Sequence, residues 1–148
     1  MMKTIEEEFN YTFKSEHQKA IINLKYTSNW LSNIHNNYMA QFNLSMAQFN
    51  ILRILRGAKD FISVTTIKDK MIEKSPNTTR LMDKLEDKNL ILREKCKDDR
   101  RIIYAKISKE GLELLSKIDV TFDDFFLSSN LSDKEAKELN TLLDKMRS

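Results

Sequence analysis

The fold is decided by residues 76–108, which read PNTTRLMDKLEDKNLILREKCKDDRRIIYAKIS. In the first part, apolar residues recur at the 3.6-residue period of a helix, at Leu81, Met82 and Leu85. The period changes to 2 in the runs 90–95 and 102–107, and the six residues between these runs are mostly charged. The stretch therefore predicts a helix followed by a β-hairpin with a charged tip.

The ends of this helix and of the helices before it are marked by capping residues. Ser75 is a good N-cap and Pro76 fits the first helical position, so the helix is expected to start there. Asn89 is expected to end it in the left-handed conformation. Upstream, the capping box 45–48 starts a helix that Gly57 can end, and Ser63 starts another. The order is therefore helix, short turn, helix, hairpin.

Longer helices flank this central unit. The capping box 15–18 starts an uninterrupted amphipathic pattern that reaches about Phe42, and residues before it form a short helix or an arm. One helix is predicted after Ser108 and another after the capping box 132–135. We therefore predict a mainly α fold with a small β-hairpin (α+β), in a single domain of 148 residues.

The charges are distributed unevenly. Residues 68–106 hold 12 Lys and Arg against 8 Asp and Glu, a net charge of +4, whereas the whole chain carries +3. A local positive excess is the first mark of a polyanionic partner. A single cysteine, no membrane span and no apolar segment after the N-terminus indicate a cytoplasmic protein.

Catalytic, cofactor and metal sites find little support. With two glycines in the chain a Gly-rich phosphate loop is excluded. The two histidines, His17 and His35, are about 27 Å apart along one predicted helix, too far to share a metal ion within one chain. We therefore expect no enzyme activity, no cofactor and no metal.

The outer face of the helix after Ser75 carries short polar side chains followed by long cations. Asn can read adenine and Arg can read guanine through paired hydrogen bonds in the major groove, and Thr can contact a base or a phosphate. An amphipathic helix with a solvated face would show the same pattern. The candidate DNA-binding residues on this segment are Ser75, Pro76, Asn77, Thr79, Arg80 and Lys84.

The hairpin tip adds a second cationic element. An arginine on a projecting hairpin fits a narrow minor groove, where the potential is most negative. A carboxylate nearby can hold that arginine in a fixed pose. Charges that keep an edge strand soluble are the alternative, but the helix and the tip together favour DNA. The candidate tip residues are Lys97, Asp99, Arg100 and Arg101.

The chain also resembles the MarR family of bacterial transcription regulators. The similar stretches are 44–52 (LSMAQFNIL), 79–91 (TRLMDKLEDKNLI), 98–101 (DDRR) and 107–111 (ISKEG), and the long flanking helices extend the likeness over nearly the whole chain. Asn89 departs from the usual Gly, and Pro76 is unusual in the recognition helix and removes an N–H that could bind phosphate.

The resemblance implies a winged helix-turn-helix homodimer. Residues 44–108 would form the DNA-binding lobe, and residues 1–43 and 109–148 would form the dimerisation helices. Arg101 would be the wing arginine in the minor groove, with Asp99 as its orienting partner.

Many family members also bind small aromatic compounds in a cleft between the dimer helices and the DNA-binding lobe. Candidate residues for such an effector site are Tyr26, Trp30, His35 and Tyr38, although core or dimer packing explains them equally well. Cys96 lies between two lysines that could lower the pKa of its thiol, but a half-buried structural cysteine fits better. The early reactive cysteine of some related peroxide sensors has no counterpart here.

These features predict a sequence-specific regulator of transcription that binds double-stranded DNA. It would bind as a homodimer to a pseudo-palindromic operator, would repress rather than activate, and could be released by a small ligand. The alternatives are a winged-helix module for protein–protein interaction and a ligand-binding dimer without DNA contact.

Overall fold

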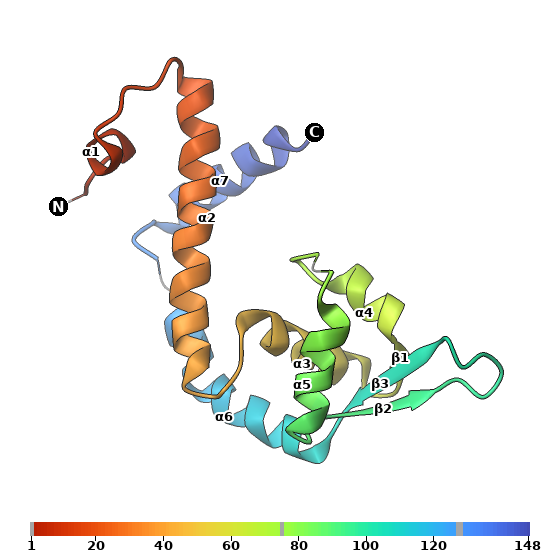
Figure 1. Ribbon diagram of the computed structural model, residues 1–148. Helices are drawn as coiled ribbons and strands as arrows, with labels where there is room; N and C mark the ends of the chain where they lie inside the picture. Colours follow the sequence, from red (N-terminus) through yellow and green to blue (C-terminus); the bar gives the residue numbers. More distant parts are fainter. Residues whose placement is uncertain (1, 75, 127–128) are drawn as a thin grey trace.

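The computed structural model describes residues 2–74, 76–126 and 129–148. It is mainly helical with one small antiparallel sheet (Figure 1), as the sequence predicted. In chain order the described elements are α1 (Ile5–Phe9), α2 (Glu16–Ala40), α3 (Met46–Ala58), β1 (Ile62–Ser63), α4 (Val64–Lys70), α5 (Thr78–Asp87), β2 (Ile91–Lys95), β3 (Ile103–Ile107), α6 (Lys109–Phe126) and α7 (Asp133–Met146).

The core lies where α3, α5, the sheet and the first part of α6 meet. Its fully buried side chains include Phe49, Leu52, Met82, Leu85 and Ile118. The three residues Thr78, Met82 and Leu85, spaced by four and three, form the buried face of α5. Burial of that face leaves the opposite side of the helix exposed.

The start of α5 differs from the prediction. The helix begins at Thr78, and Pro76 and Asn77 lie in the turn before it; Ser75 lies outside the described residues. Thr78 is buried and its hydroxyl points at the sulfur of Met71 at 3.8 Å. The first residue of the helix is thus also part of its buried face.

The other helix ends are set by hydrogen bonds. Asn89 is left-handed, with φ 61°, and the N–H groups of Asn89 and Leu90 donate to the carbonyls of Glu86 and Leu85. This confirms Asn89 as the end of α5. Gly57 does not end α3: the helix continues to Ala58, and the left-handed residue is Lys59. Gly57 does not have the positive φ of such a terminator.

The capping boxes starting at Ser45 and Ser132 are both complete. At Ser15 only half of the predicted box forms. The hydroxyl of Ser15 accepts from the backbone N–H of Gln18 at 3.1 Å, but the Gln18 side chain accepts from the N–H of Lys14. The helix start is nevertheless where the sequence placed it.

The predicted hairpin is present, and it belongs to a larger sheet. β2 and β3 pair antiparallel from Ile91 with Ile107 to Lys95 with Ile103. β1 adds a third strand, in the order β1-β3-β2. Two residues are too few to show a period-2 pattern, which explains why the sequence did not reveal β1.

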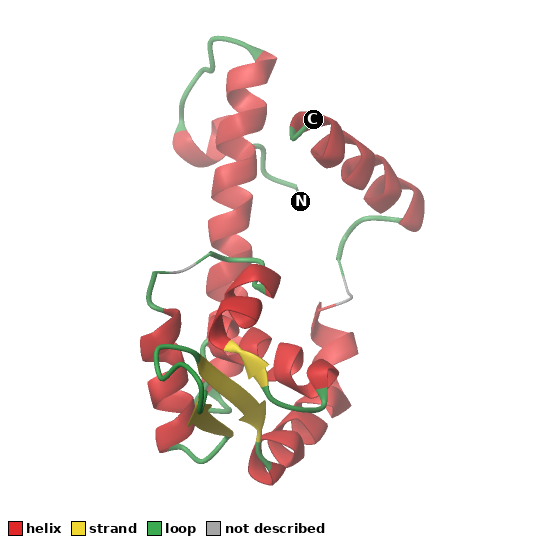
Figure 2. Ribbon diagram, turned by 90° about the vertical axis from the view of Figure 1, so that its right-hand side faces the viewer, coloured by secondary structure: helices red, strands yellow, loops and turns green. Residues whose placement is uncertain are grey.

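The helices α2 and α7 extend away from the core. Figure 1 shows the N-terminal part of α2 rising above the lobe that contains the sheet, and in Figure 2 α7 stands apart from that lobe. α7 has no buried residue, and its apolar residues include Leu139, Leu142 and Met146, which are 44%, 63% and 50% exposed.

Candidate nucleic-acid interface

The exposed face of α5 presents the side chains that the sequence singled out. Thr79, Arg80 and Lys84 are exposed on the helix, and Pro76 and Asn77 are exposed in the turn before it. Within residues 2–74, 76–126 and 129–148, the side chains of Arg80 and Lys84 have neither a hydrogen bond nor an ion pair. Their charges are therefore available to a ligand.

The hairpin tip is organised by Asp99. The carboxylate of Asp99 accepts two hydrogen bonds from the guanidinium of Arg101, each 3.0 Å long, and one from the Arg101 backbone N–H at 3.1 Å. The hydrogen bonds from the side chain and then the backbone of Arg101 hold the pKa of Asp99 below its ordinary value. The Arg101 side chain is nevertheless 91% exposed. The pair therefore orients a cation that still faces solvent.

The rest of the tip is also polar and exposed. Lys97 and Arg100 are exposed, and their side chains have no ion pair in the described chain. The loop itself is closed by backbone hydrogen bonds from Cys96 to Ile102 (2.9 Å) and from Ile102 to Asp99 (3.0 Å). The tip is a short ordered loop with three cations.

An ion-pair network joins the hairpin to α5, and the sequence analysis missed it. Arg93 of β2 donates to Glu86 through Nε (3.0 Å) and Nη2 (3.1 Å), and its Nη2 lies 2.7 Å from Oδ1 of Asp83. The Glu86 contact raises the pKa of Arg93, and the Arg93 hydrogen bonds lower the pKa of Glu86. The two candidate binding elements are thus attached to each other.

Two of the four candidate effector residues, His35 and Tyr38, pack against the same ring, that of Phe125 in α6, and the other two lie elsewhere. Tyr26 packs edge-on against Phe9 of α1, with ring centroids 4.9 Å apart, and Trp30 is 52% exposed. Tyr38 stacks on Phe125 of α6 with centroids 4.0 Å apart, and its hydroxyl is hydrogen-bonded to that of Thr121.

His35 lies nearer to α7. It lines an apolar cavity of about 640 Å³ between α2 and α7, which Tyr26, Trp30 and Tyr38 do not line. Partial burial lowers the pKa of His35. Of the four, His35 is therefore the one placed at a cavity.

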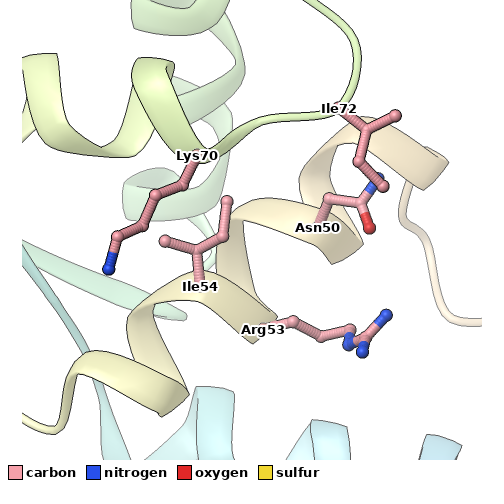
Figure 3. Close-up of a pocket in the computed structure, with 5 residues that line it drawn as sticks. All are labelled: Asn50, Arg53, Ile54, Lys70 and Ile72. Carbon is pink, nitrogen blue, oxygen red and sulfur yellow. The ribbon is translucent and has the colours of Figure 1, made fainter.

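Another hollow lies between α3 and the end of α4. It measures about 250 Å³ and is lined by Asn50, Arg53, Ile54, Lys70 and Ile72. Figure 3 shows the charged ends of Arg53 and Lys70 pointing away from each other on opposite sides of Ile54. The Arg53 guanidinium instead lies near the rings of Phe49 and Phe122, 5.7 and 5.3 Å from their centroids. The two cations do not converge on a common ligand position.

Other kinds of site receive no support from the described residues. They contain no group of three or more His, Cys, Asp or Glu side chains placed to hold a metal ion. None of their helices combines the length and the apolar character needed to cross a membrane. Cys96 is half-buried.

The helices α4 and α5, joined by a turn and followed by the β2–β3 hairpin, define a winged helix-turn-helix protein. Residues 44–103 match the MarR family. The resemblance seen in the sequence is thereby confirmed over these residues.

Individual relatives agree with this assignment. The chain is 29% identical over 113 residues to the HTH-type transcriptional regulator MhqR of Bacillus subtilis, which covers 75% of this chain and 77% of MhqR. A putative MarR-like transcription regulator from Bacillus cereus has a TM-score of 0.80 and 20% identity, covering 89% of this chain and 96% of that one. A mutant MarR from E. coli, complexed with operator DNA, has a TM-score of 0.73 and 24% identity, covering 86% of this chain and 93% of that one.

Proposed function

We propose that the protein is a homodimeric regulator of transcription that binds double-stranded DNA through α5 and the β2–β3 hairpin. The observation that carries the proposal is the set of solvent-exposed cations on α5 and at the tip of a hairpin attached to it. In a winged helix-turn-helix, the second helix enters the major groove and the hairpin lies beside it. The mutant MarR from E. coli, which has a similar fold and is complexed with operator DNA, supports DNA as the ligand.

Each element has a distinct role in the proposal. Arg80, and Asn77 at the start of the helix, read base edges in the major groove, Thr79 contacts a base or a phosphate, and Lys84 contacts a phosphate. Arg101, oriented by Asp99, enters the minor groove, and Lys97 and Arg100 neutralise phosphates beside it. Ser75 and Pro76 remain proposed contacts to the DNA backbone.

The proposed dimer is supported by apolar surface that one chain leaves exposed. A 14-residue helix with no buried residue gains little from propensity alone and needs a packing partner. The apolar residues of α7 and the exposed Ile21, Leu24 and Leu31 of α2 offer such a surface to a second copy. Residues 1–43 and 109–148 would then form the dimer, and residues 44–108 the DNA-binding lobe.

Two-fold symmetry sets the form of the operator. Two α5 helices related by a dyad require half-sites about 10–10.5 base pairs apart, or a multiple of that spacing, in a pseudo-palindrome. We further propose that the protein acts in the cytoplasm and represses transcription by blocking the polymerase. A small aromatic ligand that binds near His35 would release it from the DNA. The ligand would act by favouring conformations of the dimer in which the distance between its two DNA-binding lobes no longer matches the operator.

Base readout by Arg80 gives a specific prediction. Arg80→Ala is expected to weaken binding to the preferred duplex by about 1–3 kcal/mol and to relax the preference at one base pair. Lys84→Ala is the matched control, because loss of a phosphate contact weakens binding to all sequences alike. Competition binding against single-base-pair variants of the duplex measures both effects. Unchanged discrimination in Arg80→Ala would remove this residue from base readout.

The proposal as a whole is tested by selecting bound sequences from random duplexes. The affinity for the selected duplex is then measured as a function of salt concentration. Binding through phosphates weakens with a slope of about −0.9 in log affinity against log salt for each phosphate neutralised. A protein–protein module or a ligand-binding dimer of this fold would bind no duplex at low salt. That result would rule out the DNA-binding function.

A further inference from the structure

Arg93 occupies a position where a small sheet ordinarily holds an apolar side chain. Along β2, Ile91 and Arg93 share one face because side chains alternate, and Ile91 is 1% exposed. Leu92, on the other face, is 53% exposed. The strand thus turns a leucine toward solvent and an arginine inward, which reverses the usual alternation.

The surroundings of Arg93 accommodate its charge. Its cross-strand partner is Ala105, a small and fully buried residue. The Arg93 side chain is 18% exposed. Its guanidinium donates two hydrogen bonds to Glu86 and lies 2.7 Å from the carboxylate of Asp83. Asp83 and Glu86 lie three residues apart, so they occupy neighbouring turns of α5 on the side that faces β2.

Stability alone is a weak reason for this arrangement. Replacing a partly buried ion pair by well-packed apolar residues is often neutral or stabilising. Planar paired hydrogen bonds do, however, fix the direction and distance between the elements that carry them. Here those elements are α5, which carries Arg80, and β2, which leads to the tip that carries Arg101.

We propose that Arg93 is a positioning residue that holds the hairpin at a fixed angle to α5, so that Arg80 and Arg101 reach adjacent grooves of one duplex together. This inference rests on the proposed DNA-binding function. A β2–β3 hairpin, or wing, that is held in place contributes its full contact energy to DNA binding. A wing that must be ordered on binding loses part of that energy to conformational entropy. Arg93 also offsets two carboxylates that would otherwise repel the phosphates.

The test compares the contribution of Arg101 in two backgrounds. Arg101→Ala is expected to weaken binding to the selected duplex about tenfold in the wild-type background. In an Arg93→Gln background, the same substitution is expected to weaken binding by less than about threefold, because the wing is no longer pre-positioned. Affinities are measured well below the midpoint of thermal unfolding, so that all variants are folded.

Two further variants separate positioning from charge and from general stability. Arg93→Lys keeps the charge but cannot form the planar, forked contact with both carboxylates, so we expect it to resemble Arg93→Gln in this readout. Arg56→Gln removes an arginine–aspartate pair of similar length, 2.8 Å to Asp119, that joins α3 to α6. In that background Arg101→Ala should keep its tenfold effect.

The outcomes distinguish this inference from the function it rests on. An equal effect of Arg101→Ala in the wild-type and Arg93→Gln backgrounds would overturn the positioning role while leaving DNA binding intact. Full recovery by Arg93→Lys would assign the effect to charge and would also overturn it. Failure of the wild-type protein to bind any duplex would overturn both proposals.

Discussion

Gly111→Ala is expected to destabilise the protein by about 3 kcal/mol or more, a large part of the about 5–15 kcal/mol by which a typical domain is stable. A Cβ at Gly111 would lie 2.3 Å from the carbonyl oxygen of Leu90 and 2.7 Å from Cγ1 of Ile107. The first contact is with backbone, which cannot move aside as a flexible side chain can. The clash falls where three elements meet, so relieving it displaces more than one of them.

Hydrogen bonds hold this junction together. The Ser108 N–H donates to the Leu90 carbonyl at 3.0 Å, its hydroxyl donates to the Asn89 carbonyl at 2.6 Å, and the Gly111 N–H donates to that hydroxyl at 3.0 Å. These bonds join the end of α5 and the start of β2 to the start of α6. An alanine at 111 therefore disturbs the attachment of the hairpin to the core.

Gly57→Ala is the matched control. Gly57 lies inside α3 and an added Cβ would meet no neighbouring atom within 4 Å, so alanine there should stabilise the protein by about 0.5–1 kcal/mol through helix propensity. Urea unfolding of both variants, followed by circular dichroism, measures the difference. Similar stability of the two variants would show that residue 111 has room for a side chain.

Leu142→Asp is expected to convert the proposed dimer into a monomer at micromolar concentration. Leu142 is 63% exposed in the single chain and lies on the apolar face of α7 with Leu139 and Met146. If that face packs against a second copy, the aspartate places an unpaired charge in an apolar interface, at a cost of several kcal/mol, or about a hundredfold or more in the dissociation constant.

A control on the same helix isolates the interface from the charge. Thr141→Asp adds the same charge one residue away, at an exposed position off the apolar stripe. It should leave the mass measured by sedimentation equilibrium unchanged. The monomeric Leu142→Asp protein should also lose most of its operator affinity, because one half-site then binds without the other. A dimer that persists in Leu142→Asp would place the interface elsewhere.

The sequence predicted most of the fold because the decisive elements carry strong local patterns. The change of period near Asn89 located the end of α5 and both strands of the hairpin, and Asn89 has the left-handed conformation that its residue type favours. The pairing suggested for Asp99 and Arg101 is present in the structure. These features depend on residues close together in the chain.

Features that depend on distant residues were harder to predict. β1 exists because its two residues meet Ala105 and Tyr104 of β3, and no local pattern marks that pairing. The start of α5 was also predicted two residues too early: the helix begins at Thr78, although Pro76 is locally suited to a first helical position.

The role of Arg93 also escaped the sequence analysis. Its signal was present as an inverted alternation, with Leu92 outward and Arg93 inward. That signal becomes informative only when the acidic residues of α5 are known to lie opposite. Whether Tyr26, Trp30, His35 and Tyr38 bind an effector stays a prediction.

The most direct measurement is a hydroxyl-radical footprint of the full-length protein on its selected duplex, with the mass of the complex determined in parallel. We expect two protein chains on one duplex and two symmetric protected regions with centres about 10–10.5 base pairs apart or a multiple of this. Minor-groove protection beside each region should disappear in Arg101→Ala. A single chain on the duplex, or protection without two-fold symmetry, would contradict the proposal that paired α5 helices and wings bind the operator.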